Sequence, residues 1–91
     1  MLEKVKMALR LTGAGFDPEI RDLIDEALTD LDMIGIDTGN DADPLILSAV
    51  KLYSRLHFGE PDDYDRLDKA YHELKGQLKL SSRYQRGEAD G

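Results

Sequence analysis

The acidic residues between Asp37 and Asp43 have the types and spacing that come nearest to a metal site in this 91-residue chain. A calcium-binding EF-hand loop needs an oxygen ligand at its third position, a glycine at its sixth and a glutamate at its twelfth. Counted from Asp37, those positions hold Gly39, Ala42 and Ser48. The loop therefore fails the pattern, and we interpret it as a solvated acidic loop that ends in a helix N-cap at Asp43.

The histidines and serines do not form a catalytic pattern. His57 and His72 are the only histidines, and because the chain has no cysteine, these two residues cannot close a zinc site. Ser48, Ser81 and Ser82 lack the glycine context of a nucleophile elbow, and no glycine-rich phosphate loop is present. We therefore expect no catalytic residue, no metal and no cofactor.

An acyl-carrier protein is an alternative for an acidic helical chain of this size. Carriers attach their prosthetic arm to a serine in an Asp-Ser-Leu motif that opens a helix, and the sequence contains no Asp-Ser pair. Ser48 follows Leu47 inside an apolar segment, which would bury the attachment point. The sequence therefore argues against a carrier.

Charge is distributed unevenly along the chain. The formal net charge is −7, from 19 acidic and 12 basic residues, which argues against a general phosphate-binding surface and against direct DNA binding. Acids crowd residues 17–43, whereas bases predominate in residues 64–86. One predicted helix therefore carries an acidic face, formed by Asp22, Asp25, Glu26 and Asp30. Another carries a basic face, formed by Arg66, Lys69, Lys75 and Lys79.

Hydrophobic periodicity predicts an all-α fold in which these faces belong to the second and fourth helices of a compact bundle. The four helices are predicted at about residues 2–11, 18–34, 44–58 and 63–79. The third is apolar on nearly every side, so we expect it to be the central helix. The length fits a single domain at residues 1–84, followed by a flexible, disordered tail at residues 85–91.

Glycine and proline indicate where these helices begin and end. Asp17-Pro18 and Asp43-Pro44 each predict an N-cap aspartate followed by proline at the first helical position. Gly35 is predicted to adopt the left-handed conformation after the second helix, with Ile36 folding back onto that helix. Gly76 is expected to weaken or bend the fourth helix, at a cost of roughly 1 kcal/mol relative to alanine.

The N-terminal segment, MLEKVKMALR, has charges among its apolar residues, so we expect neither a signal peptide nor a membrane anchor. No apolar stretch approaches the length that spans a bilayer. The lack of cysteine fits synthesis in a reducing cytoplasm.

Tyr84 has two interpretations. It follows the last predicted helix, beside Arg83 and Arg86, and an exposed tyrosine next to arginines is typical of a binding hot spot. The alternative is simple packing on the end of the bundle. Under the first interpretation, the segment that starts at Leu80 is dispensable for folding and is needed for binding a partner.

Four segments together resemble the small head–tail connector proteins of tailed bacteriophages and prophages, which are often labelled putative DNA-packaging proteins. These segments are LEKVKMALRLT, DPLILSAVKLY, HFGEPDDY and YHELKGQLKLSSRY, and the resemblance extends over about residues 1 to 84. Their order and spacing carry it, since no single segment is diagnostic.

The resemblance implies a structural adaptor of the virion head–tail junction that is made in the host cytoplasm and is not an enzyme. Members of the family that it resembles are helical subunits that assemble into a ring, commonly a dodecamer, on the phage portal protein. The ring extends the DNA channel without sequence-specific DNA binding and supports a stopper or tail-completion protein; no membrane is involved. By position, the C-terminal segment would contact the portal through Leu80, Arg83, Tyr84 and Arg86.

A ring closes through contacts between two different faces of neighbouring copies, and the acidic and basic faces would suit such a contact. The alternative function, from another class, is a small acidic helical regulatory or antitoxin-like module that binds one protein. A gene position between portal and tail genes would favour the connector, whereas a neighbouring toxin gene would favour the module.

Overall fold

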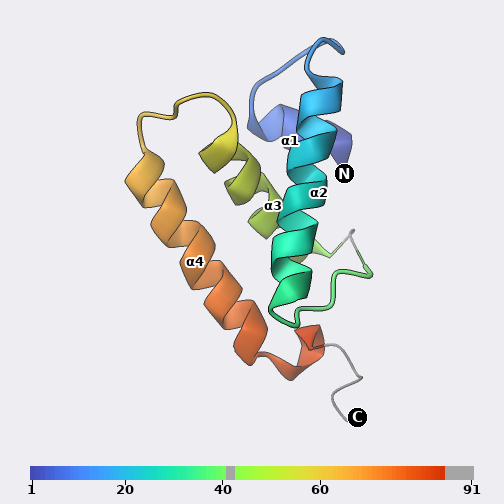
Figure 1. Cartoon of the computed structure of the whole chain (residues 1–91), viewed down its shortest axis with the longest axis vertical. Helices are drawn as coiled ribbons and strands as arrows, with labels where there is room; N and C mark the ends of the chain where they lie inside the picture. Colours follow the sequence, from blue (N-terminus) through green and yellow to red (C-terminus); the bar gives the residue numbers. More distant parts are fainter. Residues whose placement is uncertain (41–42, 86–91) are drawn as a thin grey trace.

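Four α-helices, joined by short connections, make up the computed structural model, which describes residues 1–40 and 43–85 (Figure 1). They are α1 (Leu2–Ala8), α2 (Asp17–Met33), α3 (Pro44–His57) and α4 (Tyr64–Leu80), followed by a single 3₁₀ turn, η1 (Ser82–Tyr84). The prediction of an all-α bundle of four helices is confirmed. Gln85, which we assigned to the tail, forms an isolated bridge with Ile36, and the rest of the predicted tail lies outside the described residues.

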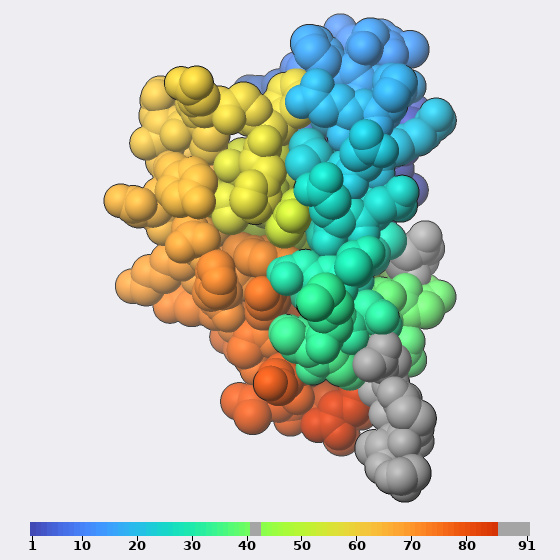
Figure 2. Space-filling view, in the orientation of Figure 1, coloured from blue at the N-terminus to red at the C-terminus, as the bar shows by residue number. Residues whose placement is uncertain are grey.

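The central position predicted for the third helix is confirmed, since α3 packs against α1, α2 and α4. In the space-filling view, α2 in blue-green and α4 in orange lie on opposite sides of one face, with the yellow-green α3 visible between them (Figure 2). Two groups of buried side chains surround α3. Val50 belongs to the group shared with α1 and α2, whereas Ile46 and Ala49 belong to the group shared with α2, α4 and η1.

The two predicted N-caps have different outcomes. Asp43 caps α3 as expected, because its Oδ1 accepts hydrogen bonds from the backbone N–H groups of Leu45 (2.9 Å) and Ile46 (3.4 Å). The prediction for Asp17 is wrong, since α2 begins at Asp17 itself and the carboxylate makes no cap. Instead, Asp17 Oδ1 lies 2.8 Å from the Nζ of Lys6, which is buried and needs a counter-charge more than the helix needs a cap.

Both α2 and α1 end in a Schellman motif. Gly35 has φ 90°, its N–H donates to Asp32 O (3.0 Å), and the N–H of the buried Ile36 donates to Leu31 O (3.1 Å), as predicted. In α1 the left-handed residue is Arg10, with φ 61°, which the sequence pattern did not reveal. This motif ends α1 at Ala8, earlier than the predicted residue 11.

Gly76 does not interrupt α4, which continues to Leu80, and a β-carbon built at Gly76 would meet no atom within 4 Å. Replacing Gly76 by alanine is therefore expected to stabilise the protein by about 0.5–1 kcal/mol, measured by chemical denaturation. Gly35→Ala is the matched control: it should destabilise by about 1 kcal/mol, because φ at this position is 90°. A loss of stability in Gly76→Ala would contradict the open environment seen around Gly76.

Candidate protein-interaction surface

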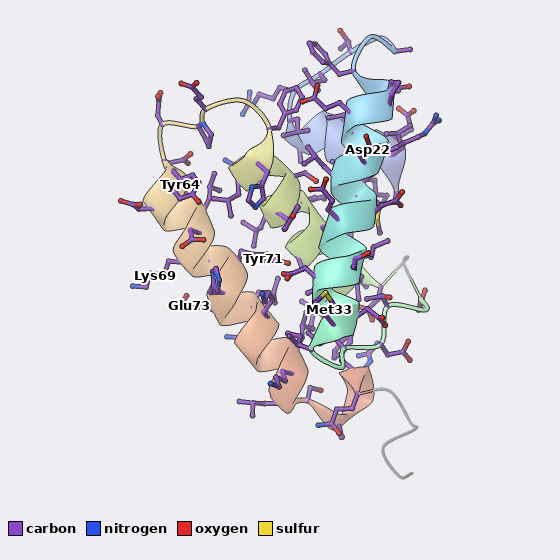
Figure 3. The ribbon with its side chains drawn as sticks, in the orientation of Figure 1. Asp22, Met33, Tyr64, Lys69, Tyr71 and Glu73 are labelled. Atoms are coloured by element: carbon purple, nitrogen blue, oxygen red, sulfur yellow. The ribbon has the colours of Figure 1, made fainter. Side chains whose placement is uncertain are left out.

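The acidic face lies on the solvent side of α2, where Asp22 and Met33 are labelled in Figure 3. Asp22, Asp25 and Glu26 are exposed because the opposite side of the same helix is buried against α3 and α1. A groove of about 400 Å³ lies beside this face. It is lined by Asp25, Glu26, Thr29, Asp30, Met33 and Tyr53. Met33 is 76% exposed, so the groove combines an apolar wall with carboxylates.

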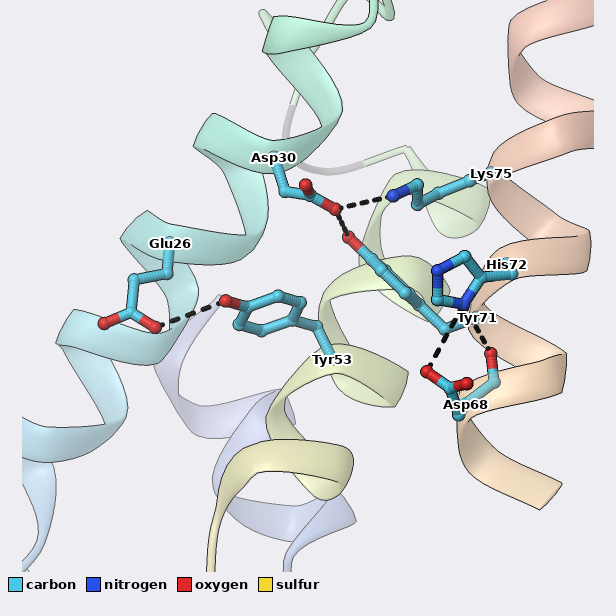
Figure 4. A network of polar contacts seen from close by, with 7 residues as sticks. All are labelled: Glu26, Asp30, Tyr53, Asp68, Tyr71, His72 and Lys75. Carbon is cyan, nitrogen blue, oxygen red and sulfur yellow. Dashed lines mark hydrogen bonds and ion pairs between the residues drawn. The ribbon is translucent and has the colours of Figure 1, made fainter. Parts of the chain in front are cut away.

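Asp30, the last member of the acidic face, is engaged inside the chain (Figure 4). Its Oδ2 accepts hydrogen bonds from the Tyr71 hydroxyl (2.5 Å) and from Lys75 Nζ (2.9 Å). Partial burial alone would raise the pKa of Asp30, but the hydrogen bonds from Tyr71 and Lys75 and the charge of Lys75 outweigh it, so the pKa is lowered. Burial and the Asp30 carboxylate raise the pKa of the Tyr71 hydroxyl. This network ties α2 to α4.

The structure therefore brings one residue of each predicted face together within a single subunit, Asp30 with Lys75. Arg66 is also engaged, in an ion pair with Asp63 at the start of α4. Lys69 and Lys79 are exposed and have no ion pair within residues 1–40 and 43–85. The basic face is consequently reduced to two residues that are free for an external partner.

Aromatic side chains lie between α2 and α4. The Tyr53 hydroxyl donates to Glu26 Oε1 (3.3 Å), and the Tyr53 ring lies 4.3 Å from the His57 ring and 5.5 Å from the Tyr71 ring, measured between centroids. His72 lies on α4 within 3.4 Å of Asp68 Oδ1. Tyr53 thus contacts the acidic face through Glu26, and the two histidines do not form a common site.

Tyr84 packs on the bundle, which is the second of its two interpretations. The side chain is only 7% exposed, and its hydroxyl donates to both carboxylate oxygens of Asp43, at 3.0 and 3.1 Å. The Tyr84 carbonyl accepts from the Asp37 N–H (2.5 Å). Burial would raise the pKa of Asp43, but the N–H of Leu45 and the Tyr84 hydroxyl outweigh it and lower the pKa.

Three other residues were predicted to contact a partner. Leu80 is 86% exposed at the end of α4, and the Arg83 side chain is 74% exposed although it reaches Asp43 Oδ2 at 3.3 Å. Arg86 lies outside the described residues. The expectation that the segment from Leu80 is dispensable for folding is corrected, because Tyr84 is part of a buried cluster with Leu31. Sequence reasoning missed this because Asp43 lies far away along the chain.

Comparison with known proteins decides the family. The family model described as phage connector protein matches residues 1–85, a range that includes every described residue. The chain belongs to the phage connector protein family. No curated protein and no solved structure gave a significant match.

The phage connector family is a structural family, and its members are components of the virion that interact with other head or tail components. In the described part of this connector, no group of three or more His, Cys, Asp or Glu residues is placed to hold a metal ion. Likewise, no helix among the described residues is long and apolar enough to cross a membrane.

Proposed function

We propose that this connector is a head-completion adaptor that assembles into a ring on the phage portal protein. The ring extends the DNA channel at the head–tail junction and supports a stopper or tail-completion protein. The single observation that carries this proposal is the family match over residues 1–85, which leaves no room within that range for a second domain with another activity.

The distribution of charge suits such a ring. The acidic residues of α2 and the free lysines of α4 lie on different elements. A ring of identical copies is closed by contacts between two such unlike faces. Exposed single ion pairs contribute only about 0–1 kcal/mol, so the charges set register and partner choice more than affinity. Because the protein carries a net negative charge, it would not bind the phosphates of DNA that passes through the ring.

Attachment to the portal is assigned to the C-terminal segment, through Leu80, Arg83 and Arg86. Exposure of Leu80 and Arg83 supports this role. Tyr84, being buried, would act indirectly, by holding the segment against Asp43. We propose a dodecameric ring, matching the symmetry of the portal.

Native mass spectrometry of the connector, alone and mixed with its cognate portal, tests the proposal. We expect several connector copies to bind each portal ring, and we expect fewer to bind as salt is raised, because screening weakens contacts between exposed charges. A connector that stays a monomer and does not bind the portal would refute the proposed function. Assembly that does not respond to salt would refute the role of the charged faces alone.

A further inference from the structure

The groove beside α2 offers an acidic site that the subunit itself leaves open. No ion pair or hydrogen bond engages the Asp25 side chain among the described residues, and Glu26 accepts only the 3.3 Å hydrogen bond from Tyr53. Met33 lines the same groove and, at 76% exposed, is the one large hydrophobic side chain of α2 that is exposed. A partner that fits here needs a cation at the end of an apolar stem.

Lys69, an exposed residue of α4, meets that description. Its side chain extends from α4 away from the bundle, at a level along the long axis similar to that of Met33 (Figure 3). Arg66 and Lys75, the nearest members of the basic face, are held by Asp63 and Asp30. Lys79 lies ten residues further along α4, about 15 Å beyond Lys69 at 1.5 Å per residue.

We propose that Lys69 of one connector docks into the groove of the next copy, with its ammonium group between Asp25 and Glu26 and its methylene stem against Met33. This contact rests on the proposed ring and specifies the residues that close it. The contact joins two different elements of the subunit, α2 of one copy and α4 of the next, as an interface between the identical copies of a ring requires.

Charge reversal tests the pairing. Lys69→Glu and Asp25→Lys should each raise the connector concentration needed for half-maximal assembly on the portal at least about tenfold, since like charges then face each other. An equimolar mixture of the two variants should assemble again, because each supplies the face that the other can bind. Lys4→Glu, an equal change of charge at an exposed residue of α1, is the matched control and should assemble as the wild type does.

Melting temperatures close to the wild-type value would establish that the variants fold, as expected for exposed positions. Normal assembly of Lys69→Glu, an equal defect in Lys4→Glu, or failure of the mixture would each overturn the pairing while leaving a wild-type ring on the portal intact. Failure of the wild type itself to assemble on the portal would overturn the proposed function and the pairing together.

Discussion

Replacing Tyr84 by alanine is expected to lower the melting temperature of the connector by about 10 °C or more. The ring fills a buried position against α2 and α3, and the hydroxyl donates to the Asp43 carboxylate that caps α3. The substitution therefore opens a cavity and removes a hydrogen-bond donor from a buried carboxylate in one step. Thermal unfolding followed by circular dichroism measures the effect.

Two neighbouring variants separate these contributions. Tyr84→Phe keeps the ring and loses only the hydroxyl, so its melting temperature should fall between those of the wild type and Tyr84→Ala. Arg83→Ala should change the melting temperature little, because the Arg83 side chain is 74% exposed and the Tyr84 hydroxyl still donates to both oxygens of Asp43. A Tyr84→Ala variant as stable as the wild type would show that the C-terminal segment is only an external arm.

Asp30 is expected to give the second-largest effect among the variants considered. Asp30→Ala leaves the Tyr71 hydroxyl and the Lys75 ammonium without their shared acceptor, and Tyr71 is only 2% exposed. A buried donor left without a partner costs about 1–3 kcal/mol, so the melting temperature should fall by roughly 4–10 °C. Asp25→Ala, on the same helix but without an internal partner, should stay within about 0.5 kcal/mol of the wild type.

The pKa of Asp30 fixes how this contribution depends on pH. Its folded-state pKa is lowered from 3.8, so ionised Asp30 stabilises the protein fully above the unfolded value, and the stabilisation is lost as pH falls through the folded pKa. The difference in stability between the wild type and Asp30→Asn should therefore be constant near neutral pH and shrink below about pH 4. A difference that does not change with pH would show that the carboxylate charge is not what ties α2 to α4.

Local sequence patterns predicted the fold because the fold depends on local signals. The apolar stripes of α2 and α4, the nearly uniform apolarity of α3, the Asp43 cap and the Gly35 turn all lie within a few residues of what they determine. Arg10 is the exception, since an arginine in the left-handed conformation carries no turn signal and α1 was predicted too long.

The candidate site was harder to predict because its contacts join distant parts of the chain. Asp30 forms hydrogen bonds with residues more than 40 positions away along the chain, and so does Asp43. Charge composition alone assigned Asp30 and Lys75 to opposite faces for contacts between copies, whereas the packing of α2, α3 and α4 pairs them inside one subunit. Only the tertiary structure shows which charges are left for a partner, among them Asp25 and Lys69.

The central claim is that this connector forms a ring on the portal, and cryo-electron microscopy of the portal mixed with the wild-type connector tests it most directly. We predict a closed ring of connector subunits on the portal, with α2 of each copy facing α4 of the next and the C-terminal segments directed at the portal. Portal rings that carry no connector density, or connectors bound singly without touching one another, would contradict it.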